Sequence, residues 1–377
     1  MSHDRHTRRS FLQGRAAATE MAALADQSSA IESGSEATPA NTQAVLQRPD
    51  AEGRESLLVS VRRRAMACEW EVQLAAGRDD DSMEHVFAAL DLVEALEDQM
   101  TVYRAESEVQ TINRQAAMGP VIVEPRLFGM FQLAQRLHQE TDGALDITSG
   151  PLSETWGFSR RRGRVPDPAE IAAALTRIGM SDIVLDEAQR TIAFGRPEIA
   201  VHFNCIGKGY ALDRMAETLD EAEVGDYLLH GGKSSVLARG DQPGQQNGSG
   251  WTIGLRHPLR PAERLAEFSL RDQSLSTSGS GTQFFRRRGQ RYGHILDPRT
   301  GQPVEGIFSA TVIAPTAAEA DALSTAFYVM GPEKTAAYCA ARPAVSAVLV
   351  CPTSREGNVR LFACGLNDGQ WQQLADR

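Results

Sequence analysis

The sequence contains few cysteines, few aromatic residues and no long apolar run. Its five cysteines are odd in number and widely spaced, without a C-x-x-C pair: Cys68, Cys205, Cys339, Cys351 and Cys364. This pattern fits neither a disulfide framework nor a structural zinc site. No stretch approaches the roughly 20 apolar residues that span a bilayer, so we expect no transmembrane segment. The net charge of −10 lacks the basic surplus of nucleic-acid-binding proteins, so we expect no nucleic-acid partner.

Two common nucleotide-binding motifs are also missing. There is no G-x-G-x-x-G fingerprint between a strand and a helix, and no G-x-x-x-x-G-K-[ST] loop. Gly207-Lys208-Gly209 does open a predicted helix. Free backbone amides at such a helix start can bind an anion, to which Lys208 would add a charge. A surface lysine with no ligand is the alternative.

Residues 1–55 are expected to form a leader and a disordered linker. Thr7-Arg8-Arg9-Ser10-Phe11-Leu12 resembles a twin-arginine export signal, but Arg15 and Glu20 interrupt the apolar run that follows. Localisation to the cell envelope or periplasm and a cytoplasmic location therefore both stay open. Residues 27–54 are rich in Ser, Ala, Glu, Gln and Pro, a composition typical of disordered segments, although docking on a partner is an alternative.

Residues 56–377 show the patterns of a folded domain. Apolar residues at helical spacing predict helices over 81–100, 103–113, 126–140, 168–178, 207–219, 318–329 and 332–341. Alternating or short apolar runs predict strands over 56–62, 70–75, 183–185, 191–194, 199–203, 227–230, 235–238, 251–255, 265–270, 309–314, 346–351 and 359–362. Because the helices are grouped between runs of strands, the fold class is α+β rather than a doubly wound sheet.

The stretch over residues 274–325 combines three features that point to chemistry. Ser276-Thr277-Ser278-Gly279 is small and polar and predicts a hydroxyl-rich loop. His294 lies on a short strand just before the turn Asp297-Pro298-Arg299-Thr300-Gly301. Asp321 and Thr325 are four residues apart on a predicted helix and therefore share one face. This face is a candidate Mg²⁺ site, or else the two side chains only make local hydrogen bonds.

Several motifs, in this order, resemble the FAD:protein FMN transferases, the ApbE-type flavin transferases. They are Met66-Ala67-Cys68, Thr101-Val102-Tyr103, Gly143-Ala144-Leu145-Asp146, Trp156-Gly157-Phe158, Gly207-Lys208-Gly209-Tyr210, Thr277-Ser278-Gly279, His294 to Gly301, and Asp321-Ala322-Leu323-Ser324-Thr325. The resemblance spans about residues 56–365. It implies an α+β domain over residues 56–377 with mixed sheets, helices packed on them, and a T-fold-like ApbE architecture.

The resemblance also implies a reaction, in which Mg²⁺ at the pyrophosphate of FAD assists transfer of FMN to a Ser or Thr of an acceptor flavoprotein, with release of AMP. It implies metal ligation by Asp321, Thr325 and the carbonyl of Cys205. It places His294 at the position of the base or phosphate-binding group, although His294 could instead only hydrogen-bond the turn. The flavin-nucleotide contacts that it implies are Met66, Tyr103, Ala144, Leu145, Asp146, His202, Lys208 and Ile295. Asp146 could equally be a turn cap.

The chain departs from the family pattern in three places. His202-Phe203-Asn204-Cys205 replaces a more acidic, Gly-rich run, Ser280-Gly281 stands where Asp-Tyr is frequent, and Ser324 replaces a second acidic residue of some members. A mononuclear metal site is therefore favoured over a binuclear one. Two alternative functions remain open, an FAD pyrophosphatase that uses water as acceptor and a flavin-binding protein without chemistry.

Overall fold

The computed structural model describes residues 43–47, 58–76, 80–245, 248–281, 283–355 and 357–374. The possible export signal over residues 7–12 lies outside the described residues, as does most of the expected linker. One part of that linker differs from the expectation. Residues 43–47 form strand β1 (Gln43–Gln47), which pairs antiparallel with β2 (Leu58–Ala65).

A nine-stranded antiparallel sheet forms the centre of the molecule, in the order β1-β2-β3-β7-β8-β11-β14-β15-β16. After β1 and β2, its strands are β3 (Cys68–Ala75), β7 (Tyr227–Gly231), β8 (Ser235–Arg239), β11 (Ser274–Gly279), β14 (Ser309–Ala314), β15 (Ser346–Pro352) and β16 (Val359–Cys364). A two-residue turn joins β2 to β3, and both of its residues, Met66 and Ala67, have positive φ. That is the geometry of a tight hairpin turn matched to the strand twist.

Both faces of the sheet are buried around its middle, so β7, β8, β14 and β15 are buried along nearly their whole length. Successive side chains of a strand point to opposite faces. In β7, Tyr227 and Leu229 join the large core beneath the helices, whereas Leu228 joins a second core. A three-stranded sheet covers that second face in the order β17-β10-β9, with β9 (Trp251–Arg256), β10 (Arg264–Leu270) and β17 (Trp371–Gln373).

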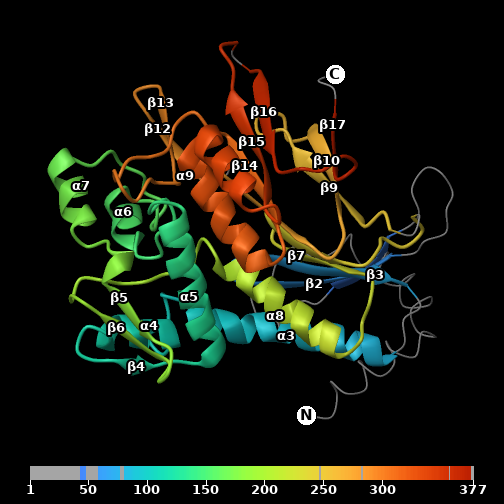
Figure 1. Ribbon diagram of the computed structural model, residues 1–377, viewed down its shortest axis with the longest axis horizontal. Coiled ribbons are helices and arrows are strands. Elements are labelled where there is room, and N and C mark those ends of the chain that lie inside the picture. The colour runs from blue at the N-terminus through green and yellow to red at the C-terminus, as the bar shows by residue number, and fades with distance from the viewer. Residues whose placement is uncertain are drawn as a thin grey trace, which may run out of the picture.

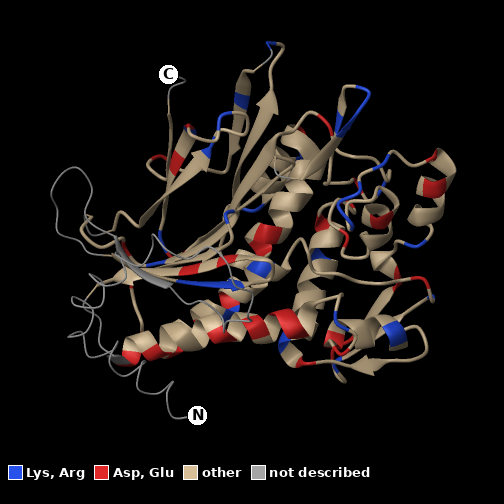
Figure 2. Ribbon diagram, turned by 180° about the vertical axis from the view of Figure 1, so that it is seen from behind, with Lys and Arg blue, Asp and Glu red and all other residues tan. Residues whose placement is uncertain are grey.

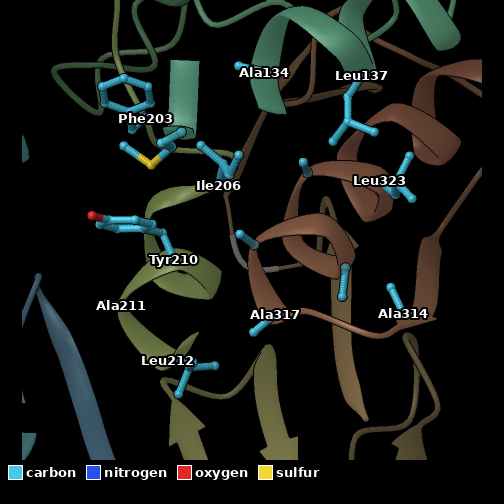
Figure 3. Close-up of a cluster of buried hydrophobic side chains, with 14 of the residues drawn as sticks. Ala134, Leu137, Phe203, Ile206, Tyr210, Ala211, Leu212, Ala314, Ala317 and Leu323 are labelled. Atoms are coloured by element: carbon cyan, nitrogen blue, oxygen red, sulfur yellow. The ribbon is translucent and has the colours of Figure 1, made fainter. Parts of the chain in front are cut away.

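Three long helices cover the first face and lie side by side (Figure 1). They are α3 (Asp80–Met100), α8 (Gly207–Glu221) and α9 (Ala317–Ala341). Gly331 breaks α9 with φ 77° just before Pro332, so α9 consists of two helical segments, as the sequence predicted. Figure 3 shows the core where α5 (Pro125–Glu140), α8 and α9 meet, with Leu137 of α5 and Leu323 of α9 among its side chains.

The remaining elements form a lobe beside α9 (Figure 1). They are α4 (Glu108–Gln115), α6 (Gly150–Thr155), α7 (Pro168–Leu175), the 3₁₀ helix η1 (Met180–Asp182), a small sheet of β4 (Val121–Ile122), β6 (Thr191–Phe194) and β5 (Ile183–Asp186), and a hairpin of β12 (Phe284–Arg287) and β13 (Gln290–Gly293).

The α+β class is confirmed, and so are the predicted helices and most of the strands. Ser107 caps α4 by accepting a hydrogen bond from the backbone N–H of Gln110. Two local predictions are wrong. Residues 199–203 form no strand. Residues 276–279 are not a loop but part of β11, which pairs with β8 and β14 near the middle of the sheet.

Candidate active site

A cleft of about 790 Å³ opens where the central sheet, α8 and α9 meet the lobe. Its walls come from the segment after α5, the turn before α8, strands β9 and β11, residues 294–298 and the start of α9. The volume lies within the range of small-molecule binding sites. The residues that line it are predominantly polar or small, so the cleft suits a polar ligand.

Asp321 is the most heavily bonded side chain of the cleft. It is buried on the first segment of α9, and its Oδ1 accepts hydrogen bonds from Ser276 Oγ at 2.8 Å and Ser235 Oγ at 3.1 Å. Its Oδ2 accepts from the backbone N–H of Gly209 at 3.0 Å, and Lys208 Nζ lies 3.4 Å from Oδ1. Because a buried polar group needs hydrogen-bond partners, these contacts hold the Asp321 side chain in a fixed orientation.

Close packing of α8 against α9 makes the hydrogen bond from the Gly209 N–H to Asp321 possible. A Cβ on Gly209 would lie 2.0 Å from the carbonyl oxygen of Ala317, so only glycine fits there. Asp213, one turn later in α8, accepts hydrogen bonds at 2.8 Å from the backbone N–H groups of Ala317 and Ala318. The first turns of the two helices are therefore fastened together beside the cleft.

A group of hydroxyls continues along α9 from Asp321. Ser278 Oγ of β11 lies 3.0 Å from Thr325 Oγ1 and 2.8 Å from Ser324 Oγ. Ser324 Oγ also donates to the carbonyl oxygen of Asp321 at 2.8 Å. Asp321, Thr325 and Ser278 all line the cleft, which places one carboxylate and two hydroxyl oxygens along its wall.

His294 lies immediately after β13 and also lines the cleft. Its Nδ1 is 3.1 Å from the carbonyl oxygen of Gln283. Since a carbonyl only accepts, Nδ1 carries the proton and Nε2 of the neutral ring is the basic nitrogen. Burial lowers the pKa of His294 below its ordinary value, which keeps the ring neutral near pH 7. The partner of the ring is therefore the segment before the hairpin, and not the turn that follows.

Asp146 and His202 lie together on the wall formed by the segment after α5. Asp146 Oδ1 accepts from the backbone N–H of Thr148 at 2.7 Å and from its hydroxyl at 2.5 Å, so Asp146 does cap a turn. Both ring nitrogens of His202 are buried without a hydrogen-bond partner among the described residues. Burial lowers the pKa of His202 to about 4, so its ring is neutral.

Cationic side chains border the same cleft. Lys208 is about one quarter exposed, and Lys233 and Arg256 are exposed at the lining. Cys205 lies in the turn before α8, and burial raises the pKa of its thiol to about 12, so its sulfur is not a thiolate near pH 7. Only the carbonyl of Cys205 is then available as a hard oxygen donor.

Ten of the twelve residues singled out in the sequence line this one cleft: Ala144, Leu145, Asp146, His202, Cys205, Lys208, His294, Ile295, Asp321 and Thr325. Met66 and Tyr103 do not. Met66 lies in the β2–β3 turn, where its N–H donates to Glu97 Oε2 at 2.6 Å. Tyr103 lies outside the lining and is 79% exposed.

The sequence reasoning missed several polar groups of the cleft. Ser235 and Ser276 were not assigned to a site, yet they orient Asp321. Lys233 lines the cleft and follows Gly231-Gly232, a pair of glycines that ends a buried strand. This position in the sequence could have indicated a binding residue. Arg256, at the end of β9, has no such signal.

The oxygen donors fit a hard cation of the Mg²⁺ kind, although the protein supplies few charges. Among the described residues, no three or more His, Cys, Asp or Glu side chains gather into a metal-binding group. Mg²⁺ usually binds one or two carboxylates and completes its shell with water and substrate phosphates. Asp321 with the hydroxyls of Thr325 and Ser278 therefore fits Mg²⁺ when a phosphate-bearing substrate supplies further oxygens.

Comparison with known families adds independent information. The model of the ApbE family matches residues 66–349. The chain belongs to the ApbE family. A FAD:protein FMN transferase of Klebsiella pneumoniae is 32% identical over 69% of this chain and 79% of the relative. The FAD:protein FMN transferase of Escherichia coli K12 is 31% identical over 69% of this chain and 74% of the relative.

Solved structures of the ApbE family share the fold. The flavin transferase ApbE of Vibrio cholerae has a TM-score of 0.70 at 26% identity and covers 86% of this chain and 98% of its own. The ApbE protein of Thermotoga maritima has a TM-score of 0.70 at 26% identity and covers 80% of this chain and 96% of its own. In the part of the chain that the structure describes, no helix combines the length and apolarity of a membrane span.

Proposed function

We propose that this ApbE-family chain is an enzyme that transfers FMN from FAD to an acceptor protein. The observation that carries the proposal is the cleft itself, which gathers ten separately predicted residues from distant parts of the chain. The names of the curated relatives and of the structural neighbours support the same activity.

We further propose that the finer chemistry is attack of an acceptor Ser or Thr hydroxyl on the FMN phosphorus of FAD. The new bond joins the acceptor oxygen to that phosphorus, and the pyrophosphate bond breaks with release of AMP. Lys208, Lys233 and Arg256 supply positive charge for the phosphates, and the N-terminus of α8 adds backbone N–H groups. His202 offers one unpartnered N–H donor and one acceptor to a polar edge of the dinucleotide.

In this proposal Asp321, Thr325 and the carbonyl of Cys205 hold Mg²⁺, with Ser278 beside them. Bound Mg²⁺ would neutralise negative charge on the phosphates. Ser235, Ser276 and Gly209 keep the Asp321 carboxylate in place before substrate arrives. Lys208 makes only a long contact of 3.4 Å to Asp321 Oδ1 and lines the cleft, so its ammonium group can also bind a phosphate.

His294 is proposed as the base. Its Nδ1–H is committed to the carbonyl of Gln283, so Nε2 is the atom that takes the hydroxyl proton of the acceptor. The lowered pKa keeps this nitrogen unprotonated at neutral pH.

The test measures AMP release and protein-bound flavin fluorescence from FAD, Mg²⁺ and a purified acceptor flavoprotein domain. We expect both signals with the wild-type chain, and a loss of at least a hundredfold in rate in Asp321→Asn. Glu333→Gln is the matched control, because Glu333 is an exposed acidic residue on the same helix. Its rate should equal that of the wild type.

Other outcomes point to the alternatives. AMP formed at the same rate without any acceptor would mean that water is the acceptor and that the chain is a FAD pyrophosphatase. FAD binding without AMP under any condition would mean a flavin-binding protein. Equal rates in Asp321→Asn and the wild type would contradict the proposed metal site.

A further inference from the structure

Two short segments concentrate positive charge in an otherwise acidic protein. Residues 158–165 (Phe-Ser-Arg-Arg-Arg-Gly-Arg-Val) and residues 284–293 (Phe-Phe-Arg-Arg-Arg-Gly-Gln-Arg-Tyr-Gly) contain four arginines each and no Asp or Glu. The whole chain has 39 Lys and Arg against 49 Asp and Glu. Much of the β12–β13 hairpin is blue in Figure 2.

The two segments pack against each other and form one surface, which we call the arginine rim. The rings of Phe158 and Phe285 lie 5.5 Å apart between them. Gln283 Nε2 donates to the carbonyl of Phe158 at 3.1 Å, and Arg287 Nη1 donates to the carbonyl of Val165 at 3.2 Å. The rim is therefore a fixed feature of the fold.

Most of the positive charge of the rim is exposed and uncompensated. Seven of its eight arginines are exposed: Arg160, Arg161, Arg162, Arg164, Arg286, Arg287 and Arg288. Arg164 is paired with Glu170 at 2.7 Å. Within the described ranges, no carboxylate lies within ion-pair distance of the other six, and the remaining arginine, Arg291, covers the exposed ring of Phe284 at 4.0 Å.

The rim adjoins the lining of the cleft. Gly281 and His294, the residues on either side of the hairpin segment, both line the cleft. Ser153 of α6, just before the other segment, lines it too. The ring of Phe158 contacts His294 edge-on, with ring centroids 6.4 Å apart. A macromolecule that presents a hydroxyl near His294 therefore comes close to the arginine rim.

We propose that the arginine rim is the docking surface for the acceptor protein and that it recognises an acidic surface around the target hydroxyl. This inference rests on the proposed transferase function and adds the chemistry of the partner. Clustered exposed charge steers an oppositely charged partner and raises the association rate. The exposed ring of Phe284 supplies an apolar contact at the centre of the charged surface.

The position of the rim favours a protein partner over an anionic membrane. A membrane could bind positive charge anywhere on the surface, whereas the acceptor must come close to His294, which lies next to the rim. The rim also carries a single exposed large apolar side chain among the described residues of the two segments, Phe284. A membrane-inserting surface is expected to expose several.

The test compares three double variants with the wild type: Arg286→Glu with Arg288→Glu, Arg160→Glu with Arg162→Glu, and a control with Arg190→Glu and Arg355→Glu. All six arginines are exposed, and each pair changes the net charge by the same amount. We measure the Kd of an acidic acceptor flavoprotein domain for the FAD-loaded chain, the KM for that domain, and the Kd of FAD. Both rim variants should raise the acceptor Kd and KM at least tenfold with unchanged FAD affinity and kcat. The control variant should have the same acceptor Kd, acceptor KM, FAD affinity and kcat as the wild type.

Salt provides a second readout. Raising NaCl should weaken acceptor binding of the wild type and the control, and should have little effect on the rim variants, because screening acts on exposed charges. An unchanged acceptor Kd in both rim variants would overturn the inference even if transfer proceeds. Loss of binding to phosphatidylglycerol vesicles in the rim variants, with unchanged acceptor Kd, would overturn it in favour of a membrane. Rim-dependent acceptor binding without any transfer would refute the transferase and leave the docking surface standing.

Discussion

Replacement of Gly209 by alanine should destabilise the protein and disturb the cleft at once. The added Cβ would lie 2.0 Å from the carbonyl oxygen of Ala317 and 2.7 Å from the backbone nitrogen of Ala318. Both neighbours are backbone atoms at the start of α9, which cannot turn aside as a side chain would. The helices α8 and α9 must therefore move apart.

The expected cost has two parts. Overpacking in a dense interior costs about 1–3 kcal/mol. Separation of the helices also stretches the 3.0 Å hydrogen bond from the Gly209 N–H to Asp321 Oδ2, and a bond to a charged group contributes about 1.5–3 kcal/mol. Together these lower the free energy of unfolding by roughly 2.5–6 kcal/mol, a large share of the roughly 5–15 kcal/mol that stabilises a typical domain.

Gly129→Ala is the matched control, because Gly129 is also a helical glycine and a Cβ there meets nothing within 4 Å. Alanine in an exposed helix is favoured over glycine by about 0.8–1 kcal/mol, so this variant should be slightly more stable than the wild type. Thermal unfolding and urea midpoints measure both changes, and FAD titration measures the effect on the cleft.

The two substitutions should therefore change the free energy of unfolding in opposite directions. A Gly209→Ala variant with a wild-type midpoint and wild-type FAD affinity would refute the close packing of α8 on α9. Stable Gly209→Ala protein with weakened FAD binding would mean that only the position of Asp321 responds.

Two further predictions concern titration and oxidation. The neutral form of His294 is the proposed base, and burial lowers the pKa of this residue. The value of kcat/KM should therefore decrease with falling pH only below about pH 6.5. A decrease that already begins above pH 7 would contradict this prediction. His294→Gln should remove most of the transfer activity, and the remaining activity should lack this dependence on acidic pH. The sulfurs of Cys339 and Cys364 lie 3.6 Å apart. The thiol oxidant diamide should therefore take up the two thiol hydrogens and leave a disulfide between these residues, with a mass loss of about 2 Da for the protein. Cys364→Ser should prevent this mass change. Retention of both thiols under diamide would show that the backbone holds the two sulfurs apart.

The helix that carries the metal-site candidates could be predicted because its pattern is local. Asp321 and Thr325 are one turn apart in α9, so helical periodicity alone puts them on one face. The structure then adds what periodicity cannot give. Oδ1 of Asp321 meets Ser235 and Ser276 from two different strands, and no spacing in the sequence relates these residues to it.

Strand β11 shows why the rest of the site was not predictable. Ser276 to Gly279 has the composition of a loop, since small polar residues usually stay near water. Here tertiary context overrides that preference. Ser276 is buried, but its hydroxyl is satisfied by Asp321 and Ser278 is satisfied by α9. The strand predicted over residues 199–203 is wrong for the opposite reason. The apolar side chains of this segment are buried in the core, but its backbone pairs with no strand.

The pairing of β3 with β7 has a kinetic consequence. Trp70 faces Gly231 across neighbouring strands, yet every element from α3 to α8 lies between them in the chain. Such a contact must close a very long loop before it gains any stabilisation, and folds of this kind assemble slowly. Until β7 arrives, one edge of β3 stays unpaired and can pair with another chain. The yield of refolded protein should therefore fall steeply as the protein concentration during refolding rises.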